Sequence, residues 1–556
     1  MIPQNPRISI QNNKINLKFD YDPAIISAIK EIPGREFNGI YKIWSVPVTD
    51  ESINRLRTIG FDTMSILSQI EMLKASALKE FDNYKREIVK DFPFLYDYQV
   101  EGVAKGLVLD HFLLGDDTGI GKTQEALAIM DYRLKRNMID SIYVVCPKTI
   151  KESVWKRRAK KFFDIDFNII KGTKQKRAEQ YLNGGNLIFN YEQITSDLSL
   201  LRSMLLRNGL IIDEASSLKN ETTKRYQVFK ELNPKYSIYA TGTPIEKKLR
   251  DGFNIGVLVN PNWMTRGEFF NNYCIFSKMW TPAGEVSYVS GYKNIPQFME
   301  RLMEIGIRRK KEDVKQMPGK YQYRRDIELS KLQRKCYGII VDGVKKLIEK
   351  KEIDIKTQLF RCQPFFAMIE DSTDLLLLSE AKTLENMDFS FLEQSHPLSE
   401  TSPKLVELKS LLEELSGKVV VFTQSKRMIP IIDNQLREEG YKVFSGSGDT
   451  TDRMDLIDRF EKEGDILVVN DAFKFGVDMP FATNLVHFDL LWNNAWMQQR
   501  EDRIYRITSE KPVNIHKLVT DGLDGTILNR LEQEGQNMVE FDLNEQLKNF
   551  ILQYKK

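Results

Sequence analysis

The stretch Gly119-Ile120-Gly121-Lys122-Thr123 follows the apolar run Phe112-Leu113-Leu114, and Asp213-Glu214-Ala215-Ser216 follows the apolar run Leu210-Ile211-Ile212. Glycines allow backbone N–H groups to wrap around phosphates, a lysine supplies positive charge, and a threonine hydroxyl can ligate Mg²⁺. Of two carboxylates at a strand end, one can hold the metal through water and the other can orient the attacking water. Because the two motifs occur together, in this order and each after a buried-strand pattern, they predict an enzyme that hydrolyses ATP.

The composition is typical of a soluble globular protein, with 42% hydrophobic and 29% charged residues. A chain of 556 residues predicts about three or four domains. No stretch is apolar enough to span a bilayer, and the N-terminus lacks the pattern of a secretory signal. The four cysteines and four histidines stand far apart, which predicts neither a zinc site nor a disulfide framework. We expect a cytoplasmic protein of a bacterial or phage-infected cell.

Positive charge is concentrated in two stretches, although the net charge of the chain is only +3. Residues 151–177 carry ten Lys or Arg against three Asp or Glu, and residues 301–325 carry nine against three. A local excess of basic residues is typical of proteins that contact a phosphate backbone. A solvated helix face would show the same pattern, so each stretch alone leaves both interpretations open.

Short apolar runs that alternate with helical segments predict the fold class. Such runs recur from Phe112 to Ala240 and again from Val419 to Leu518. They are typical of parallel sheets with helices on both faces. Residues 251–400 lose this rhythm and are expected to be mostly helical, with an irregular piece containing Gly and Pro at 281–296. The sequence therefore predicts an α/β protein with two such lobes and a helical insertion between them.

The remaining motifs of the first lobe occur in a characteristic order. Leu95-Tyr96-Asp97-Tyr98-Gln99 precedes the phosphate loop, and three strands end at Val145-Cys146-Pro147-Lys148-Thr149, at Asn190-Tyr191-Glu192 and at Thr241-Gly242-Thr243-Pro244. In this order the motifs resemble those of superfamily-two helicases. Leu218-Lys219-Asn220, after the Asp-Glu motif, is particularly similar to the Swi/Snf-type DNA translocases.

Motifs in the predicted insertion and in the second lobe extend the resemblance. Gly291-Tyr292-Lys293-Asn294 and Ile307-Arg308-Arg309-Lys310-Lys311-Glu312-Asp313-Val314 resemble the protrusion and basic segment of the Swi/Snf group. Gln499 to Ile507 contains Arg503 and Arg506, which would share one face of a helix. This segment stands where the group has its arginine-finger motif. In related chemistry such an arginine is worth roughly 10³–10⁵ in rate.

The resemblance implies ATP and Mg²⁺ as ligands, DNA as the partner, and a role for each motif. The residues implied in catalysis are Lys122, Asp213, Glu214, Arg503 and Arg506. Those implied in binding the nucleotide are Gln99, Thr118, Gly119, Ile120, Gly121, Lys122, Thr123, Gly476 and Asp478. Thr123 and Asp213 would hold Mg²⁺ through ATP and water. Contacts with DNA, mainly to its backbone, would be made by Lys148, Thr149, Tyr191, Arg308, Arg309, Lys310, Lys311, Ser445, Gly446 and Trp492. Coupling between the two sites would involve Thr241, Gly242, Thr243 and Gln499.

The N-terminal residues predict a further small unit. Residues 8–63 have the pattern of a strand, a helix from Pro23 to Ile32, and a strand from Tyr41 to Val48. Arg35 to Gly39 and Lys42 to Pro47 resemble the HARP domain of annealing helicases, which implies action on forks and other branched DNA. Trp44 could stack on bases there, with basic neighbours, or it could be a core residue.

The predicted division of the chain follows from these patterns and resemblances. It comprises a HARP-like unit at 1–65, a helical linker at 66–90, a RecA-like lobe at 91–250, a helical insertion at 251–402, a second RecA-like lobe at 403–535 and a helical tail at 536–556. We expect an ATP-dependent DNA helicase or translocase for fork regression, branch migration or annealing in replication, recombination or repair.

Several residues depart from the pattern of the resembled family. Asp116 stands where the strict phosphate-loop motif has glycine, Ser216 where histidine is usual, and Glu246-Lys247 where asparagine is common. Thr508-Ser509 replaces Gly-Gln. Gly476-Val477-Asp478-Met479-Pro480 is closer to an RNA-helicase motif. An RNA-directed helicase and a junction-binding protein with a vestigial ATPase therefore remain alternatives, whereas no additional carboxylate and histidine cluster favours a nuclease.

Overall fold

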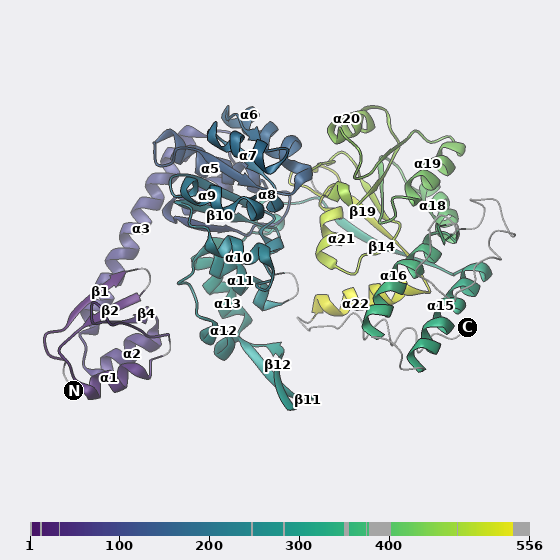
Figure 1. The fold of residues 1–556 in the computed structure, drawn as a ribbon. Coiled ribbons are helices and arrows are strands. Elements are labelled where there is room, and N and C mark those ends of the chain that lie inside the picture. Colours follow the sequence, from purple (N-terminus) through teal and green to yellow (C-terminus); the bar gives the residue numbers. More distant parts are fainter. Residues whose placement is uncertain are drawn as a thin grey trace. The chain divides into compact units, whose positions relative to one another are not determined.

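The computed structural model of the protein describes residues 3–11, 14–32, 34–245, 248–281, 284–349, 355–373, 375–376, 402–474 and 476–536 (Figure 1). The chain forms two compact units. Unit 1 comprises Met1–Asp116, Lys122–Cys146 and Ile170–Arg308, and unit 2 comprises Asp117–Gly121, Pro147–Ile169 and Arg309–Lys556. Both contain a parallel sheet flanked by helices, as the sequence predicts. Among the described helices, none combines the length and the apolar character needed to cross a membrane.

An antiparallel sheet with helices packed against it opens unit 1. Its strands, in the order β1-β2-β4-β3, are Arg7–Gln11, Lys14–Lys18, Ile43–Pro47 and Glu36–Asn38. Its helices are α1 (Pro23–Lys30), α2 (Asp50–Ile59) and the start of α3 (Thr63–Asp91). The core is made by the inward residues of β2 and β4, including Trp44, which is only 9% exposed. Of the two interpretations of Trp44, a base-stacking residue or a core residue, the structure supports the core residue.

Six strands of unit 1 form its main sheet. In spatial order they are β13 (Gly306–Ile307), β5 (His111–Leu114), β10 (Tyr236–Ala240), β9 (Gly209–Asp213), β6 (Ile142–Val145) and β8 (Leu187–Phe189). The short strand β7 (Asn168–Ile169) belongs to a segment assigned to unit 2. The pairings from β13 through β8 are all parallel. Apolar residues fill both faces of the central strands, as expected where helices cover both sides.

Helices connect these strands. They are α4 (Asp97–Val108), α5 (Lys122–Lys135), α7 (Lys174–Leu182), α8 (Tyr191–Ser196), α9 (Leu198–Leu205), η3 (Ala215–Leu218), α10 (Lys224–Glu231) and α11 (Leu249–Val259). Segment Pro147–Ile169, which belongs to unit 2, carries η1 (Lys148–Ile150), the π-helical turn η2 (Lys151–Lys156) and α6 (Arg157–Phe163).

The region after the first lobe differs from the prediction. The helices α12 (Arg266–Tyr273) and α13 (Ile295–Glu304) are present, but β11 (Cys274–Thr281) and β12 (Gly284–Tyr292) form a long antiparallel hairpin. The expected irregular piece is therefore wrong over most of its length. Aromatic and β-branched residues along both strands favour extended structure, and this outweighs the Gly and Pro residues that suggested a loop.

Unit 2 is built on a six-stranded parallel sheet. Its strands, in spatial order, are β14 (Lys320–Ile327), β19 (Val513–Thr520), β18 (Asn484–His487), β15 (Val419–Thr423), β17 (Ile466–Asn470) and β16 (Val443–Gly446). β14 lies inside the predicted helical insertion, so that expectation is wrong for this segment. Its pairing with β19 supplies the hydrogen bonds that make it a strand.

Along the chain, the helices of unit 2 lie before, between and after the strands of its sheet. They are α14 (Lys311–Val314), α15 (Lys331–Glu349), α16 (Ile355–Asp371), α18 (Pro403–Glu414), α19 (Met428–Glu438), α20 (Arg453–Glu463), η5 (Asp471–Lys474), α21 (Asn494–Glu501) and α22 (Leu523–Gln536). Tyr337 and Phe366, from α15 and α16, share a core with Leu523 and Ile527 of α22. The predicted tail after Gln536, and Glu246 and Lys247, lie outside the described residues.

Candidate functional site

The predicted nucleotide motifs meet at the carboxyl edge of the unit 1 sheet. Strands β5, β10 and β9 are consecutive neighbours, and Leu114, Ala240 and Asp213 stand side by side in register. The phosphate loop follows Leu114, and Thr241 follows Ala240. Ligands bind at this edge in parallel sheets, because the loops that leave the strands gather there. The register thus brings together three motifs that lie far apart in the sequence.

The phosphate loop has the backbone that a phosphate cradle requires. Gly119 and Gly121 have φ angles of +94° and +101°, which favour glycine. α5 begins directly after them, so its first N–H groups are available to an anion. The Lys122 ammonium donates a hydrogen bond to the Asp116 carbonyl at 2.8 Å. Ile120 is fully buried, so a nucleotide could meet only the backbone of this residue.

The Asp-Glu motif is held in a fixed turn. Asp213 is the last residue of β9, and its Oδ1 accepts a hydrogen bond from the Glu214 N–H at 3.0 Å. Glu214 has a φ of +59°, an uncommon value for a residue with a side chain. Strained backbone of this kind persists where the surroundings determine it, and it clusters at active sites.

Tyr191 supports this turn from behind. Its hydroxyl donates to the backbone carbonyl of Asp213 at 2.6 Å, and its side chain is only 4% exposed. Burial, and after it the nearby Asp213 and Glu214 carboxylates, raises the pKa of Tyr191 well above its usual value. The ring is therefore not available as the DNA contact that the sequence predicts.

Thr241, Gly242 and Thr243 occupy the strand end between the phosphate loop and the Asp-Glu turn. Thr241 is fully buried, and its N–H donates to the Leu114 carbonyl at 3.0 Å. Its hydroxyl accepts a hydrogen bond from the Thr243 N–H at 3.2 Å. The Thr241 backbone therefore links this strand end to that of β5, and its hydroxyl fixes the turn at Thr243; this is compatible with the predicted coupling role.

Gln99 is buried on α4, and its Oε1 accepts a hydrogen bond from the Tyr96 N–H at 3.1 Å. This bond closes the start of the helix. An amide oxygen has two lone pairs, so one is already engaged within the protein. The predicted contact of Gln99 with the nucleotide would have to share this side chain with the helix cap.

In unit 2, Asp478 holds the predicted arginine finger. Arg506 forms an ion pair with Asp478, and Arg158 of α6 donates to the same carboxylate at 2.8 Å. The Arg506, Arg158 and Arg503 charges outweigh burial and hold the pKa of Asp478 below its usual value. Asp478 thus positions guanidinium groups, and this role differs from the predicted contact with the nucleotide.

Arg503 and Arg506 differ in the hydrogen-bond donors that they could offer to a phosphate. α21 ends at Glu501, so the helix expected over both arginines is wrong, and turns carry them instead. Arg503 is buried and donates to the carbonyls of Gln499 at 3.1 Å and Val477 at 3.2 Å. Arg503 therefore acts in packing this segment, together with the buried Gln499.

Arg506 has the properties of an anion-binding group. Among the described residues, its buried Nε has no hydrogen-bond partner. Burial lowers the pKa of Arg506 to about 10, which leaves the guanidinium charged at neutral pH. A Cβ on Gly119 would come within 2.7 Å of the Arg506 Cδ, so within unit 2 this arginine lies beside the phosphate loop. An unmet donor at this place fits the phosphate of a bound nucleotide.

The predicted DNA contacts fall into two groups. Lys148 and Thr149 are exposed on η1, and Ser445 is partly exposed at the end of β16. Gly446 is buried, and a Cβ there would meet Phe473 Cζ at 2.6 Å, so this glycine allows close packing rather than an open loop.

The basic segment 308–311 also contains both exposed and buried side chains. Arg308 and Lys310 are exposed. Lys311 is only 3% exposed, its ammonium pairs with Asp502, and it donates to the Tyr505 carbonyl at 2.8 Å. Lys311 is therefore not available to DNA. Further along, Lys320 pairs with Glu501 at 2.6 Å, so part of the basic excess serves internal ion pairs.

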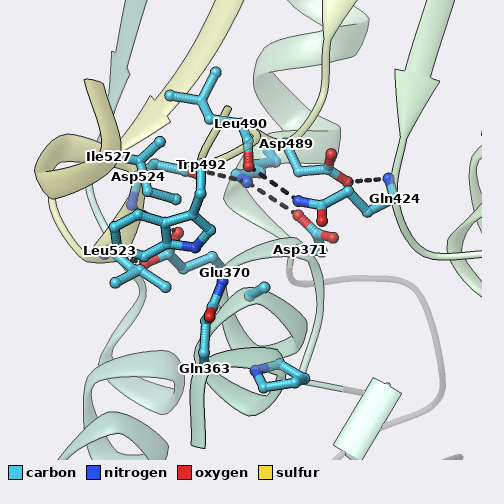
Figure 2. Close-up of a pocket in the computed structure, with 13 residues that line it drawn as sticks. Gln363, Glu370, Asp371, Gln424, Asp489, Leu490, Trp492, Leu523, Asp524 and Ile527 are labelled. Atoms are coloured by element: carbon cyan, nitrogen blue, oxygen red, sulfur yellow. Dashed lines mark hydrogen bonds and ion pairs between the residues drawn. The ribbon is translucent and has the colours of Figure 1, made fainter. Parts of the chain in front are cut away.

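Trp492 lines a cavity of about 230 Å³ in unit 2 (Figure 2). Gln424 lies nearby and donates to the Leu490 carbonyl at 2.9 Å. The polar side of the cavity is an ion cluster in which Lys404 pairs with Asp371 at 3.0 Å and with Asp524 at 2.7 Å. The predicted DNA contact of Trp492 stays a prediction, since the indole is only partly exposed.

Two features of the site escape sequence reasoning. Arg158 belongs to a basic stretch that gives no sign of its Asp478 partner, 320 residues away. The exposed Trp496 lies under the Lys474 ammonium, 3.7 Å from the ring centroid. The sequence does not predict such a pair, because the basic and the aromatic residue come together only in the fold.

Family comparisons agree with this geometry. The sequence matches the SNF2-related domain over residues 98–371 and the helicase conserved C-terminal domain over residues 403–508. The uncharacterized ATP-dependent helicase YqhH of Bacillus subtilis is 22% identical, over 81% of this chain and 80% of its own length. ISW1 of Saccharomyces cerevisiae, an ISWI chromatin-remodeling complex ATPase, is 28% identical over 79% of this chain and 40% of its own.

Other relatives are considerably longer. An uncharacterized ATP-dependent helicase of Mycoplasma pneumoniae is 25% identical over 83% of this chain and 43% of its own length. The chain thus spans less than half the length of this relative. Among solved structures, the Sulfolobus solfataricus SWI2/SNF2 ATPase core in complex with dsDNA is 24% identical, over 78% of this chain and 90% of that one, with a TM-score of 0.36.

Proposed function

Because this chain belongs to the Swi/Snf-type superfamily-two proteins, we propose that it is an ATP-dependent DNA helicase or translocase that acts on duplex or branched DNA. The observation that carries the proposal is the convergence of the phosphate loop, Thr241 and the Asp213-Glu214 turn on three adjacent strand ends. Arg506, with a buried unpaired donor beside Gly119, adds the group that the chemistry requires.

Each of these residues has a definite task in ATP hydrolysis. The phosphate loop N–H groups and Lys122 bind the phosphates of ATP. Thr123 and Asp213 are the residues that would hold Mg²⁺, which neutralises phosphate charge when bound. Glu214 orients the attacking water and accepts its proton, and Arg506 stabilises the negative charge on the transferred phosphoryl group.

Exposed basic and hydroxyl side chains support DNA as the partner. Lys148, Thr149, Arg308 and Lys310 are all exposed, and side chains of these types bind phosphate oxygens. Such contacts carry no base information, so we expect little sequence preference. The Gly-Val-Asp-Met-Pro motif, in which Asp478 holds arginines, is closer to an RNA-helicase motif. RNA is therefore an alternative partner, and the assay must distinguish it from DNA.

The N-terminal sheet supports branched substrates, in keeping with its resemblance to the HARP domain. Phe37 and Tyr41 are 52% and 64% exposed, and the Phe37 ring lies 4.7 Å from that of the buried Trp44. The Asn38 side chain accepts the Ile40 and Tyr41 N–H groups, which fixes this turn. Phe37 and Tyr41, rather than Trp44, are the rings that could stack on unpaired bases. Fork regression, branch migration and annealing all present such bases.

ATP hydrolysis by wild type and Glu214→Gln tests the proposal. Each protein is assayed without nucleic acid and with linear duplex DNA, a four-way junction and single-stranded RNA. We expect duplex and junction DNA to stimulate wild type at least tenfold and Glu214→Gln to lose the stimulated rate. Glu179→Gln, an exposed carboxylate on α7, is the matched control and should keep full activity.

Two outcomes would contradict the proposal. Stimulation by RNA alone would make the protein an RNA-directed helicase. No stimulation by any nucleic acid would favour a binding protein with a vestigial ATPase, and then Lys122→Ala should retain binding to junctions and function in cells.

A further inference from the structure

The hairpin β11–β12 is an element that the proposed motor chemistry does not use. Its two strands pair only with each other in the described sheets, and Figure 1 shows it projecting beyond α12. Only its root is packed: the Phe276 ring meets the Phe270 ring of α12 edge-on, at 5.8 Å. Two-stranded hairpins are marginally stable in water, so an exposed one with large apolar side chains suggests a binding partner.

The register assigns the hairpin side chains to two sides. One side presents the cross-strand pairs Phe276 and Val289, Lys278 and Ser287, and Trp280 and Glu285. The other side presents Met279 opposite Val286, and Ser277 opposite Tyr288. Trp280 is 79% exposed, one of the most exposed large apolar side chains among the described residues.

Polar contacts keep the hairpin in a defined shape. Lys278 pairs with Glu285 at 3.0 Å, on the same side as Trp280. The Ser277 and Ser290 hydroxyls are hydrogen bonded at 2.8 Å across the two strands. Trp280 is therefore carried on a braced strand, and Lys278 lies on the same side of the hairpin.

We propose that the end of this hairpin is a base-stacking element that contacts an unpaired base where duplex DNA opens into single strands. The proposal rests on the proposed function and names the DNA structure that the motor recognises. Every base offers a flat face to an indole, so this contact needs no particular sequence. The Lys278 ammonium, on the same side of the hairpin as Trp280, can contact the adjoining phosphate in place of Glu285.

The distribution of side chains favours a nucleic acid over an apolar protein surface. A protein groove around Trp280 would require apolar neighbours on its own side, whereas Met279, Val286 and Tyr288 lie on the opposite side. Trp280 shares its side with Lys278, Ser287 and Glu285. The segment from Cys274 to Lys293 holds two lysines and one glutamate, which is a positive excess suited to a phosphate backbone.

The test compares Trp280→Ala, Trp280→Phe and Met279→Ala in the full chain. Forked DNA with 2-aminopurine at the first unpaired position reports stacking by fluorescence, and linear duplex DNA is the reference. Removal of a stacking residue typically costs 1–3 kcal/mol per base, so Trp280→Ala should weaken fork binding by roughly five- to hundredfold. Trp280→Phe should retain most of the affinity. Met279→Ala, on the opposite side, should bind like wild type.

The outcomes separate this inference from the proposed function. Unchanged ATPase stimulation of Trp280→Ala by linear duplex, with lost fork binding, supports the stacking element. Wild-type fork binding by Trp280→Ala overturns it while leaving the motor intact. An equal loss in Met279→Ala also overturns it, because fork binding would then depend on the hairpin as a whole and not on stacking by Trp280. If no DNA stimulates or binds wild type, the motor proposal fails and the stacking element fails with it.

Discussion

Gly119 is the residue on which the geometry of the phosphate loop depends. Its φ of +94° and the 2.7 Å approach of Arg506 Cδ to any Cβ both exclude a side chain. We expect Gly119→Ala to lower ATP hydrolysis at least tenfold. Gly172→Ala is the control, because Gly172 has nearly the same φ, +93°, with only ordinary contacts at 3.5 Å. Both variants should lose about 1 kcal/mol of stability through backbone strain.

The measurement is the steady-state rate with duplex DNA, together with a thermal unfolding curve for each variant. Equal activity of the two glycine variants would mean that the loop tolerates a methyl group and that Arg506 moves aside.

Individual residues also show what sequence reasoning can and cannot reach. The order of the motifs predicts that Lys122, Asp213 and Thr241 belong to one site, because strand ends of a parallel sheet converge. The same reasoning assigns Tyr191 and Lys311 to DNA, whereas both are buried and bonded within the protein. Chemical type predicts what a side chain can bind. Its actual partner depends on packing between segments far apart in sequence.

At the scale of an element, the segment around α14 also shows that packing decides the partner of a side chain. Two adjacent lysines there have opposite environments. Lys310 is exposed, and Lys311 is buried against Asp502. Removing one partner of a buried ion pair leaves a buried charge, which costs about 3–5 kcal/mol. We therefore expect Lys311→Ala to lower the free energy of unfolding by about 3 kcal/mol, and Lys310→Ala to change it little.

Chemical denaturation measures the stability of both variants, and salt-dependent DNA binding measures their contacts. Lys310→Ala should weaken binding and reduce its dependence on salt. A normal stability of Lys311→Ala with reduced DNA binding would restore Lys311 to the DNA surface that the sequence predicts.

The hairpin and β14 show where prediction of elements fails. The sequence predicts a mostly helical region over residues 251–400, and α12, α13 and α15 lie in it, each with apolar residues in a core. β14 has few buried residues and becomes a strand through its pairing with β19. Local sequence cannot signal such pairing, because the partner lies almost 200 residues away.

At the scale of the whole molecule, the class of fold is predictable because each sheet is built from apolar runs buried on both faces. The way in which α15 and α16 join unit 2, by means of a buried ion cluster, is less predictable than the class of fold. Glu370, Asp371, Asp489 and Asp524 line one cavity (Figure 2). Lys404 pairs with Asp371 and Asp524, and Arg500 pairs with Asp489. Lys404 and Arg500 face four carboxylates, and Arg500 also pairs with Asp471, so protons must make up part of the difference.

This proton uptake predicts a pH dependence of stability. Burial, and after it the Asp524 charge, raises the pKa of Glu370 to about 8. The folded protein therefore holds this proton more tightly than the unfolded chain, in which the pKa is near 4.5. Stability contributed by the protonated form is complete at acid pH and is lost as the pH rises from about 5 to 8, by about 1.4 kcal/mol per pH unit.

Glu370→Gln removes the titration but keeps the shape of the side chain. Between pH 5.5 and 7.5 we expect the variant to gain about 2 kcal/mol relative to wild type, measured by denaturant unfolding at both pH values. Glu413→Gln, an exposed position on α18, should follow wild type at both. If the difference between wild type and Glu370→Gln stays constant with pH, Glu370 is ionised throughout. In that case the hydrogen bonds that it accepts from Tyr337 and from the start of α22 outweigh its burial.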